Sequence, residues 1–203
     1  MSLTDVAALL GRPLAHHDLG EQVVAVLGEP AGTSVDAGGT APPLALRDVD
    51  GREVPVAVPG AKTAVVAWST WCGCRYELPA WKQLADELRA DGLEVVTVAL
   101  DDDPEAVRPW TQEGLTTAVD PEHRLSDVFG VVQVPSTVWL DEEGRVVKPP
   151  TIAPGDDRWK DWTKVDAEGH HDALRRWVRT GELPAVPEAA PEDASLRTAR
   201  AER

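Results

Sequence analysis

The stretch AVVAWSTWCGCRYELP, residues 64–79, decides the fold of this chain, because it joins an apolar run to both of its cysteines. The run from Ala64 to Trp68 predicts a strand that is buried on both faces of a sheet. Helical spacing of apolar residues follows it and predicts a helix that ends at Gly92. The residues at this spacing are Leu78, Trp81, Leu84, Ala85 and Leu88. The cysteines therefore lie where a buried strand passes into a helix.

Cys72 and Cys74 are separated only by Gly73. A disulfide needs a Cα separation of roughly 4.4–6.8 Å, so the chain must bend between them, and a glycine without Cβ permits unusual dihedral angles. Closing so small a loop stabilises a fold little, while ring strain raises the reduction potential. The pair is therefore interpreted as a reactive dithiol. At a helix N-terminus Cys72 would also be placed where a thiolate is favoured.

The composition excludes some function classes. The chain has 203 residues, of which 42% are hydrophobic and 27% charged, which is typical of one soluble domain. Its formal charge of −15 argues against nucleic acid and against a membrane surface as partners. Residues 1–13 contain neither a basic start nor a long apolar stretch, so the expected location is cytoplasmic. Thiols are kept reduced there, so a cysteine pair is expected to be catalytic, redox-sensing or metal-binding and not structural.

The remaining patterns predict the domain organisation. Residues 1–39 are expected to be an extension and linker with a short helix over Leu3–Leu10, residues 40–181 the folded domain, and residues 182–203 a mobile tail. Hairpins are predicted at 44–56, around an Asp-Gly turn, and at 135–147. Other expected elements are a strand at 94–100, a helix from Asp103 to about Gly114, a strand at 117–119, and helices at 123–129 and 171–179. The order predicts an α/β fold with a mixed sheet covered by helices on both faces.

Three motifs occur in a recognisable order: WCGCRYELP at 71–79, VQVPST at 132–137 and LDEEGRV at 140–146. Together they resemble the thioredoxin superfamily over about residues 40–181, and within it the TlpA/ResA-like thiol-disulfide oxidoreductases, which are related to the AhpC/TSA peroxiredoxins. The resemblance implies a thioredoxin-like fold and redox activity. One departure is that the family has two residues between its cysteines, where this chain has only Gly73.

The resemblance also implies roles for individual residues. Cys72 is similar to the nucleophilic cysteine and Cys74 to the resolving cysteine, whereas Pro135 resembles the cis-proline that faces the dithiol. Glu77 resembles an acidic residue that tunes the cysteines, although a carboxylate in a first helical turn often only offsets the helix dipole. The substrate groove is expected to include Trp71, Gly73 and Val134.

The preferred function is therefore exchange between a Cys72–Cys74 disulfide and disulfides of proteins or small molecules. A cellular thiol would regenerate the protein, and no cofactor is expected. One alternative is a peroxiredoxin-like peroxidase, in which Cys72 attacks peroxide and Cys74 resolves the sulfenic acid. Ser69 fits that alternative, but Val65 stands where a proline is expected. A second alternative is a redox-responsive binding module without turnover.

Some other polar and aromatic residues receive simpler interpretations. The pairs at 16–17 and 170–171 are adjacent histidines without ligand spacing to the cysteines, so no metal is expected. The acidic run at 101–103 is interpreted as a solvated strand end before a helix. Trp159, Trp162 and Trp177 are expected to pack the C-terminal helical segment against the sheet.

Overall fold

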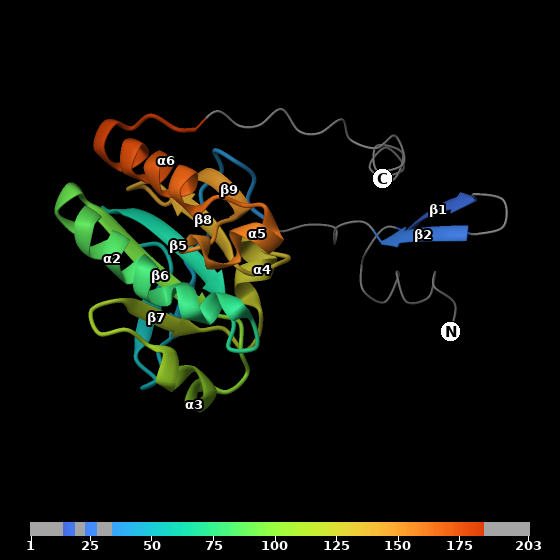
Figure 1. The fold of residues 1–203 in the computed structure, drawn as a ribbon, viewed down its shortest axis with the longest axis horizontal. Coiled ribbons are helices and arrows are strands. Elements are labelled where there is room, and N and C mark those ends of the chain that lie inside the picture. Colours follow the sequence, from blue (N-terminus) through green and yellow to red (C-terminus); the bar gives the residue numbers. More distant parts are fainter. Residues whose placement is uncertain (1–13, 19–22, 28–33, 185–203) are drawn as a thin grey trace. The chain divides into compact units, whose positions relative to one another are not determined.

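The computed structural model of the protein describes residues 14–18, 23–27 and 34–184 (Figure 1). The chain divides into two units, one of residues 34–184 and one of the residues on either side of it. In the second of these units, β1 (Leu14–Asp18) and β2 (Val23–Leu27) form an antiparallel pair that the sequence did not predict. The predicted helix at Leu3–Leu10 and the tail beyond residue 184 lie outside the described residues.

The unit of residues 34–184 is built on a seven-stranded mixed sheet in the order β4-β3-β7-β6-β5-β8-β9. The two central strands, β5 and β6, are parallel and pair in register from Lys62 opposite Leu93 to Trp68 opposite Ala99. The strands are β3 (Ala45–Arg47), β4 (Glu53–Pro55), β5 (Lys62–Trp68), β6 (Leu93–Ala99), β7 (Thr116–Val119), β8 (Ser136–Leu140) and β9 (Val146–Ile152). Both predicted hairpins are confirmed, since β3 pairs antiparallel with β4 and β8 with β9.

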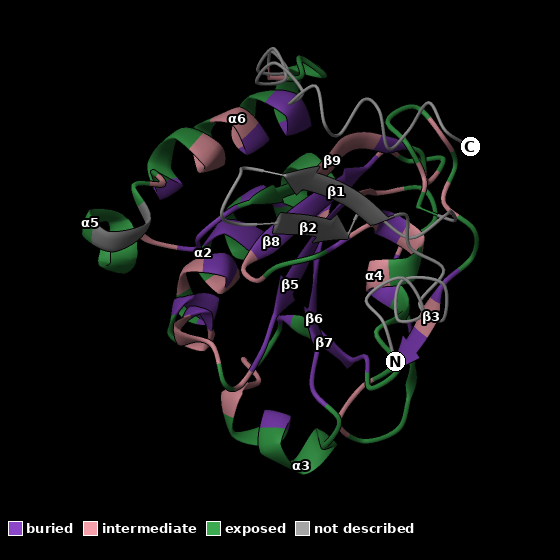
Figure 2. Cartoon of the chain, turned by 90° about the vertical axis from the view of Figure 1, so that its right-hand side faces the viewer, coloured by how far each residue is buried: buried purple, intermediate pink, exposed green. Residues whose placement is uncertain are grey.

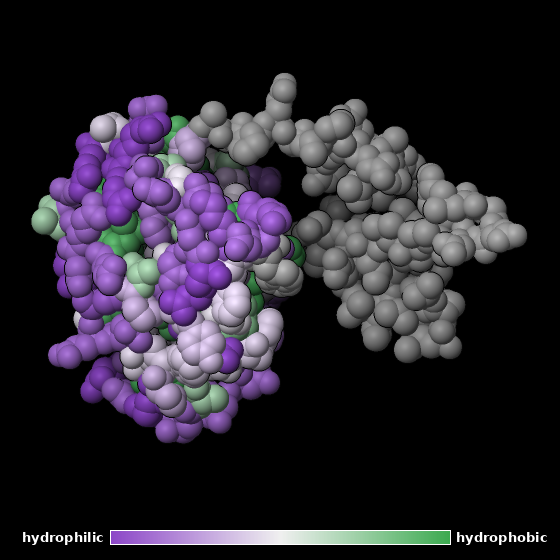
Figure 3. Space-filling view, in the orientation of Figure 1, coloured by the Kyte–Doolittle hydropathy of each residue, from purple (hydrophilic) through white to green (hydrophobic). Residues whose placement is uncertain are grey.

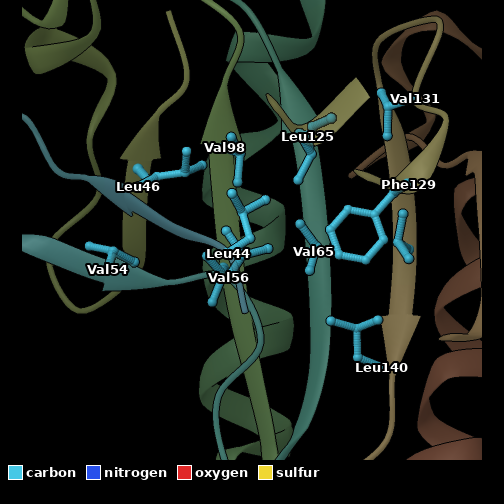
Figure 4. Close-up of a cluster of buried hydrophobic side chains, with 14 of the residues drawn as sticks. Leu44, Leu46, Val54, Val56, Val65, Val98, Leu125, Phe129, Val131 and Leu140 are labelled. Carbon is cyan, nitrogen blue, oxygen red and sulfur yellow. The ribbon is translucent and has the colours of Figure 1, made fainter. Parts of the chain in front are cut away.

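Two helical regions cover the two faces of this sheet, as the alternation of buried residues along β5 requires. Val65 and Ala67 pack with Leu125 and Phe129 of the helix α4 (Arg124–Phe129), in the core drawn in Figure 4. Ala64 and Val66 point to the other face, where they pack under the helices α2 (Leu78–Leu88) and α6 (Ala167–Thr180). Figure 2 shows α2 and α6 on one side of the buried strands and α4 on the other. The predicted α/β class with helices on both faces is confirmed.

The helix predicted from Asp103 to about Gly114 is much shorter. It consists of α3 (Pro104–Val107) and the 3-10 turn η3 (Arg108–Trp110), after which Thr111 is extended. Pro109 explains the difference, because it has no backbone N–H to continue the helical hydrogen bonds and its ring crowds the preceding turn. The other short helical elements are η1 (Gly73–Glu77), η2 (Arg89–Asp91), η4 (Asp157–Trp159) and α5 (Lys160–Thr163).

The helix α6 begins four residues earlier than predicted and pairs with α2 through charges. Arg175 and Arg179 both bind Glu87, at 2.9 and 3.0 Å, and Arg179 also binds Asp91 at 2.8 Å. Hydrophilic residues cover most of the described surface on the face drawn in Figure 3. Among the described residues, none of the helices combines the length and the apolar character needed to span a lipid bilayer.

Candidate active site

The loop between β5 and η1 is fixed by the end of the neighbouring strand. The backbone N–H of Thr70 donates to the Asp101 carboxylate at 2.9 Å, and the Thr70 hydroxyl donates to its other oxygen at 2.5 Å. Asp101 is buried, so the interpretation of this residue as part of a solvated strand end is wrong. The carboxyl ends of parallel strands meet at one sheet edge, which is why a residue after β6 can hold the loop after β5.

The two cysteines share one turn of chain. Cys72 is the N-cap of η1, in an extended conformation, and its Sγ accepts a hydrogen bond of 3.2 Å from the backbone N–H of Cys74. Both residues are free thiols, of which Cys72 is partly exposed and Cys74 buried. Burial is the main cause that raises the pKa of Cys74 far above its ordinary value, and its contact with Cys72 adds to the effect. Cys74 is therefore held as a thiol.

Glu77 is a buried carboxyl group at the end of η1. Its Oε2 accepts a hydrogen bond of 2.8 Å from the backbone N–H of Gly155. Burial raises the pKa of Glu77 to about 7, against the opposing effect of the Gly155 hydrogen bond. A carboxyl group with this pKa can both hold and release a proton near neutral pH.

The segment before β8 faces the dithiol. The peptide bond between Val134 and Pro135 is cis, as the resemblance implies, and the Cys72 thiol points to the Val134 carbonyl oxygen at 3.9 Å. This segment is far from the cysteines in the chain, but β8 pairs with β5 and brings it to the same edge of the sheet.

A cavity of about 730 Å³ opens between these segments. All seven residues predicted for the site line it, namely Trp71, Cys72, Gly73, Cys74, Glu77, Val134 and Pro135. The structure therefore brings together every predicted site residue. The opposite wall of the cavity comes from a part of the chain for which the sequence predicted no site role. This wall includes Ile152, Pro154, Trp159 and Val165.

Arg75 connects the dithiol turn to a small aromatic group. Its Nη1 donates to the Cys72 carbonyl oxygen at 2.8 Å, and its guanidinium lies over the rings of Tyr76 and Trp110, at 4.4 and 5.0 Å from their centroids. Such contacts hold a guanidinium in place. Arg75 therefore fixes the backbone around Cys72, a role that the sequence did not predict.

Two expectations about glycine and tryptophan need correction. Gly73 is not among the described glycines with positive φ, so the turn does not use the dihedral freedom expected of it. Trp159 is 40% exposed and its Nε1–H donates to the Gly73 carbonyl oxygen at 3.4 Å, so it packs at the site and not against the sheet. Trp177 does pack against the sheet, stacked on Trp139 at 5.2 Å. The side chain of Trp162 lies outside the described residues.

The histidines at 170 and 171 belong to the helix side of the sheet. His170 packs against Trp81 and Trp139, its Nε2 lies 3.3 Å from Thr137 Oγ1, and burial lowers its pKa to about 3. The other histidine pair lies in β1. Among the residues that the structure describes, no group of three or more His, Cys, Asp or Glu side chains could hold a metal ion.

Several known proteins are similar to this chain in sequence or in structure. The model of the Redoxin family matches residues 36–156. The thiol-disulfide oxidoreductase ResA of Geobacillus thermodenitrificans is 30% identical over 148 residues, which are 70% of this chain and 80% of that protein. ResA of Bacillus subtilis is 26% identical over 120 residues, 57% of this chain and 67% of the relative. A crystal structure described as a thiol:disulfide interchange protein DsbE from Chlorobium tepidum has a TM-score of 0.58 and 25% identity, and covers 71% of this chain and 96% of its own. The predicted thioredoxin-like fold is thereby confirmed.

Proposed function

The chain belongs to the Redoxin family, and from this premise we propose that Cys72 and Cys74 form a dithiol that exchanges with disulfides of other molecules. The protein is a thioredoxin-like thiol-disulfide oxidoreductase. Disulfide exchange by such a protein needs one accessible cysteine sulfur and a second cysteine sulfur beside it. The observation that carries the proposal is the 3.2 Å contact from the Cys74 N–H to Cys72 Sγ, at the wall of an open cavity.

Cys72 carries the first step. Its thiolate attacks one sulfur of the substrate disulfide, a bond forms between the two sulfurs, and the substrate's own S–S bond breaks. The second substrate sulfur leaves as a thiolate and takes a proton from water. Cys72 suits this step because it is more exposed than Cys74, and because the Cys74 N–H that points to its sulfur stabilises negative charge there.

Cys74 carries the second step. It loses its proton and attacks Cys72 Sγ, so that the Cys72–Cys74 bond forms, the mixed disulfide breaks and the remaining substrate sulfur leaves as a thiolate. Two electrons have then passed from the protein to the substrate. The raised pKa of the Cys74 thiol means that this attack needs a proton acceptor. Glu77 lines the same cavity with a pKa of about 7 and is proposed as that acceptor.

The peroxidase alternative receives no support from Ser69. Its side chain is buried, and its hydroxyl makes no hydrogen bond within the described part of the chain. It therefore does not reach Cys72 Sγ, as a hydroxyl that assists attack on peroxide would have to do. Disulfide exchange remains the preferred chemistry.

Two single substitutions test the proposal. We expect Cys72→Ser to abolish reduction of insulin disulfides, and Cys74→Ser to accumulate a mixed disulfide with the substrate, visible as an added mass that dithiothreitol removes. Consumption of hydrogen peroxide by the reduced protein, measured in parallel, should be much slower than insulin reduction. Two results would contradict the proposal. One is that the reduced wild-type protein consumes hydrogen peroxide faster than it reduces insulin. The other is that Cys72→Ser and Cys74→Ser both reduce insulin at the wild-type rate.

The reduced state must be restored by another thiol. We propose a cellular thiol as the electron donor and the cytosol as the compartment, because thiols are kept reduced there and a closely spaced cysteine pair in such a compartment is seldom structural. Fractionation of cells that express the full chain would test the location.

A further inference from the structure

Gly73 and Trp159 are in close contact. A Cβ atom at position 73 would lie 3.1 to 3.3 Å from three atoms of the Trp159 ring, which is tighter than ordinary van der Waals contact. The Trp159 Nε1–H also donates to the Gly73 carbonyl oxygen. The single residue between the cysteines is therefore small because an indole ring lies over it, and not because of an unusual backbone angle.

Trp159 is held in this place by its own segment. Asp156 accepts from the backbone N–H of Arg158 at 3.0 Å and binds the Arg158 side chain, so the turn that carries Trp159 is capped. Asp157 accepts from the backbone N–H of Ala167 at 2.8 Å and thereby joins the turn to the start of α6. The segment therefore has its own internal contacts that keep Trp159 at the wall of the cavity.

The cavity that Trp159 lines is mainly apolar. Its wall contains Ile152, Pro154 and Val165 on one side and Val134 and Pro135 on the other. Among the lining residues there is no lysine, arginine or histidine, and Glu77 is the one carboxyl group. A substrate with carboxylates beside its disulfide would lose hydration there without gaining a cation, which is costly. An apolar side chain would instead gain from burial.

We propose that Trp159 is a specificity-determining residue, and that the cavity takes the apolar side chain next to the cysteine of a polypeptide disulfide. The proposal rests on the disulfide exchange proposed above and names its substrate class. A polypeptide is favoured over a small organic disulfide because the apolar surface continues outside the cavity. Trp71 at its edge and Val132, two residues before Val134, are each 72% exposed. A small molecule within the cavity would leave that surface uncovered.

The test uses two peptides with the same disulfide and the same length, which carry leucine or aspartate beside the cysteine. The rate constant for oxidation of the reduced full-length protein is measured with each peptide and with glutathione disulfide, by acid quench and mass spectrometry. We expect the wild type to react about tenfold faster with the leucine peptide than with the aspartate peptide, since one buried leucine is sufficient for that ratio. Glutathione disulfide should react as slowly as the aspartate peptide.

Variants assign this preference to Trp159. We expect Trp159→Ala to reduce the leucine-to-aspartate ratio to about threefold or less, because about half of the apolar contact is lost. Trp159→Phe, which keeps a ring but no N–H donor, should retain most of the ratio. Leu183→Ala is the matched control, because it removes an exposed apolar side chain from a residue that does not line the cavity. Thermal unfolding midpoints show whether each variant is folded.

A double substitution tests the contact with Gly73. Gly73→Ala should slow the reaction with the leucine peptide, whereas adding Trp159→Ala should restore the rate to that of Trp159→Ala alone. An unchanged peptide ratio in Trp159→Ala, or equal rates for the two peptides in the wild type, would overturn the inference and leave disulfide exchange intact. A wild type that reacts with none of the three disulfides would overturn the proposed function as well.

Discussion

The carboxylate of Glu77 and the backbone N–H of Gly155 are joined by a hydrogen bond of 2.8 Å, across 78 positions of the chain. The approach is close enough to require glycine, since a Cβ atom at position 155 would lie 2.7 Å from the Glu77 carbonyl oxygen and 2.7 Å from Trp81 Cδ1. The hydrogen bond fixes the far wall of the cavity to the helix that carries the dithiol. Glu77 is therefore both a structural link and a buried acid.

The first prediction concerns stability and pH at Glu77. Its pKa of about 7 in the folded protein lies above the ordinary value of 4.5, so between these pH values the folded state binds a proton that the unfolded chain has released. Stability is therefore fully present below pH 4.5 and declines as the pH rises to 7. Glu77→Gln keeps an oxygen for Gly155 and removes the titration, so we expect it to be more stable than the wild type at pH 8, by up to about 3 kcal/mol. Urea unfolding at pH 5 and pH 8 measures this, and an equal difference at both values would contradict it.

The second prediction concerns the role of Glu77 as a proton acceptor. Resolution of the mixed disulfide should speed up as the pH rises through about 7, because Glu77 becomes a base there. In Glu77→Gln this inflection should vanish, and resolution at pH 7.5 should slow by about tenfold or more. The decay of a preformed mixed disulfide between Cys72 and a chromogenic thiol gives the rate. If the inflection persists in the variant, Glu77 acts only as the link to Gly155.

The third prediction concerns His170. Its pKa of about 3 lies below the ordinary 6.5, because burial disfavours the imidazolium and because Lys148 and His171 also face it. Below pH 6.5 the unfolded chain gains a proton that the folded protein does not, so stability is lost as the pH falls. Between pH 6.5 and pH 5, we expect the free energy of unfolding of His170→Gln to fall by about 1.6 kcal/mol less than that of the wild type. Parallel pH profiles of unfolding for the two proteins would contradict this, and His123→Gln, outside this cluster, is the control.

The fourth prediction concerns the loop that precedes the dithiol. Asp101→Ala leaves the Thr70 N–H and hydroxyl without their acceptor, so we expect the free energy of unfolding to fall by about 2 kcal/mol. Insulin reduction should also slow, because the loop that places Cys72 is released. Asp102→Ala changes an exposed neighbour and should alter neither quantity measurably. If the two substitutions had equal effects, Asp101 would not be the residue that fixes the loop before Cys72.

The fifth prediction concerns the reduction potential. A ring closed across one residue is tighter than one closed across two, so we expect a potential above the value of about −270 mV that is typical of thioredoxin. Each 30 mV of increase corresponds to about 1.4 kcal/mol in favour of the dithiol. Equilibration of the full chain in glutathione buffers, read by mass spectrometry after alkylation, gives the value. A potential at or below −270 mV would contradict the strain argument.

The central part of the fold could be predicted because its signals are local. The apolar run before Ser69 identified β5, the spacing from Leu78 to Leu88 identified α2, and the strand-to-helix junction placed Cys72 at a helix start. The resemblance added Glu77, Val134 and Pro135, and all of them line the cavity. Pro109 could have been used to predict a shorter helix after Asp103, because a proline interrupts the hydrogen bonds of a helix.

The far wall of the cavity could not be predicted in the same way, because it depends on contacts between distant segments. Trp159 is one of eight tryptophans and stands in a stretch without helical or strand periodicity. Gly155 and Asp101 likewise owe their roles to neighbours more than 30 positions away in the chain. The sequence predicts a small residue at Gly73 because of backbone freedom, whereas in the structure the Trp159 ring lies against it.

The burial of Cys74 has a further consequence for inhibitors. An electrophile that reaches the reduced protein meets Cys72, because Cys74 is only 4% exposed. A single adduct on Cys72 would abolish disulfide exchange, since Cys74 would then have no free sulfur with which to form a disulfide. The oxidised protein would not react with the same reagent, because Cys72 Sγ is then bonded to the sulfur of Cys74. Covalent inhibition should therefore depend on the redox state in which the reagent finds the protein.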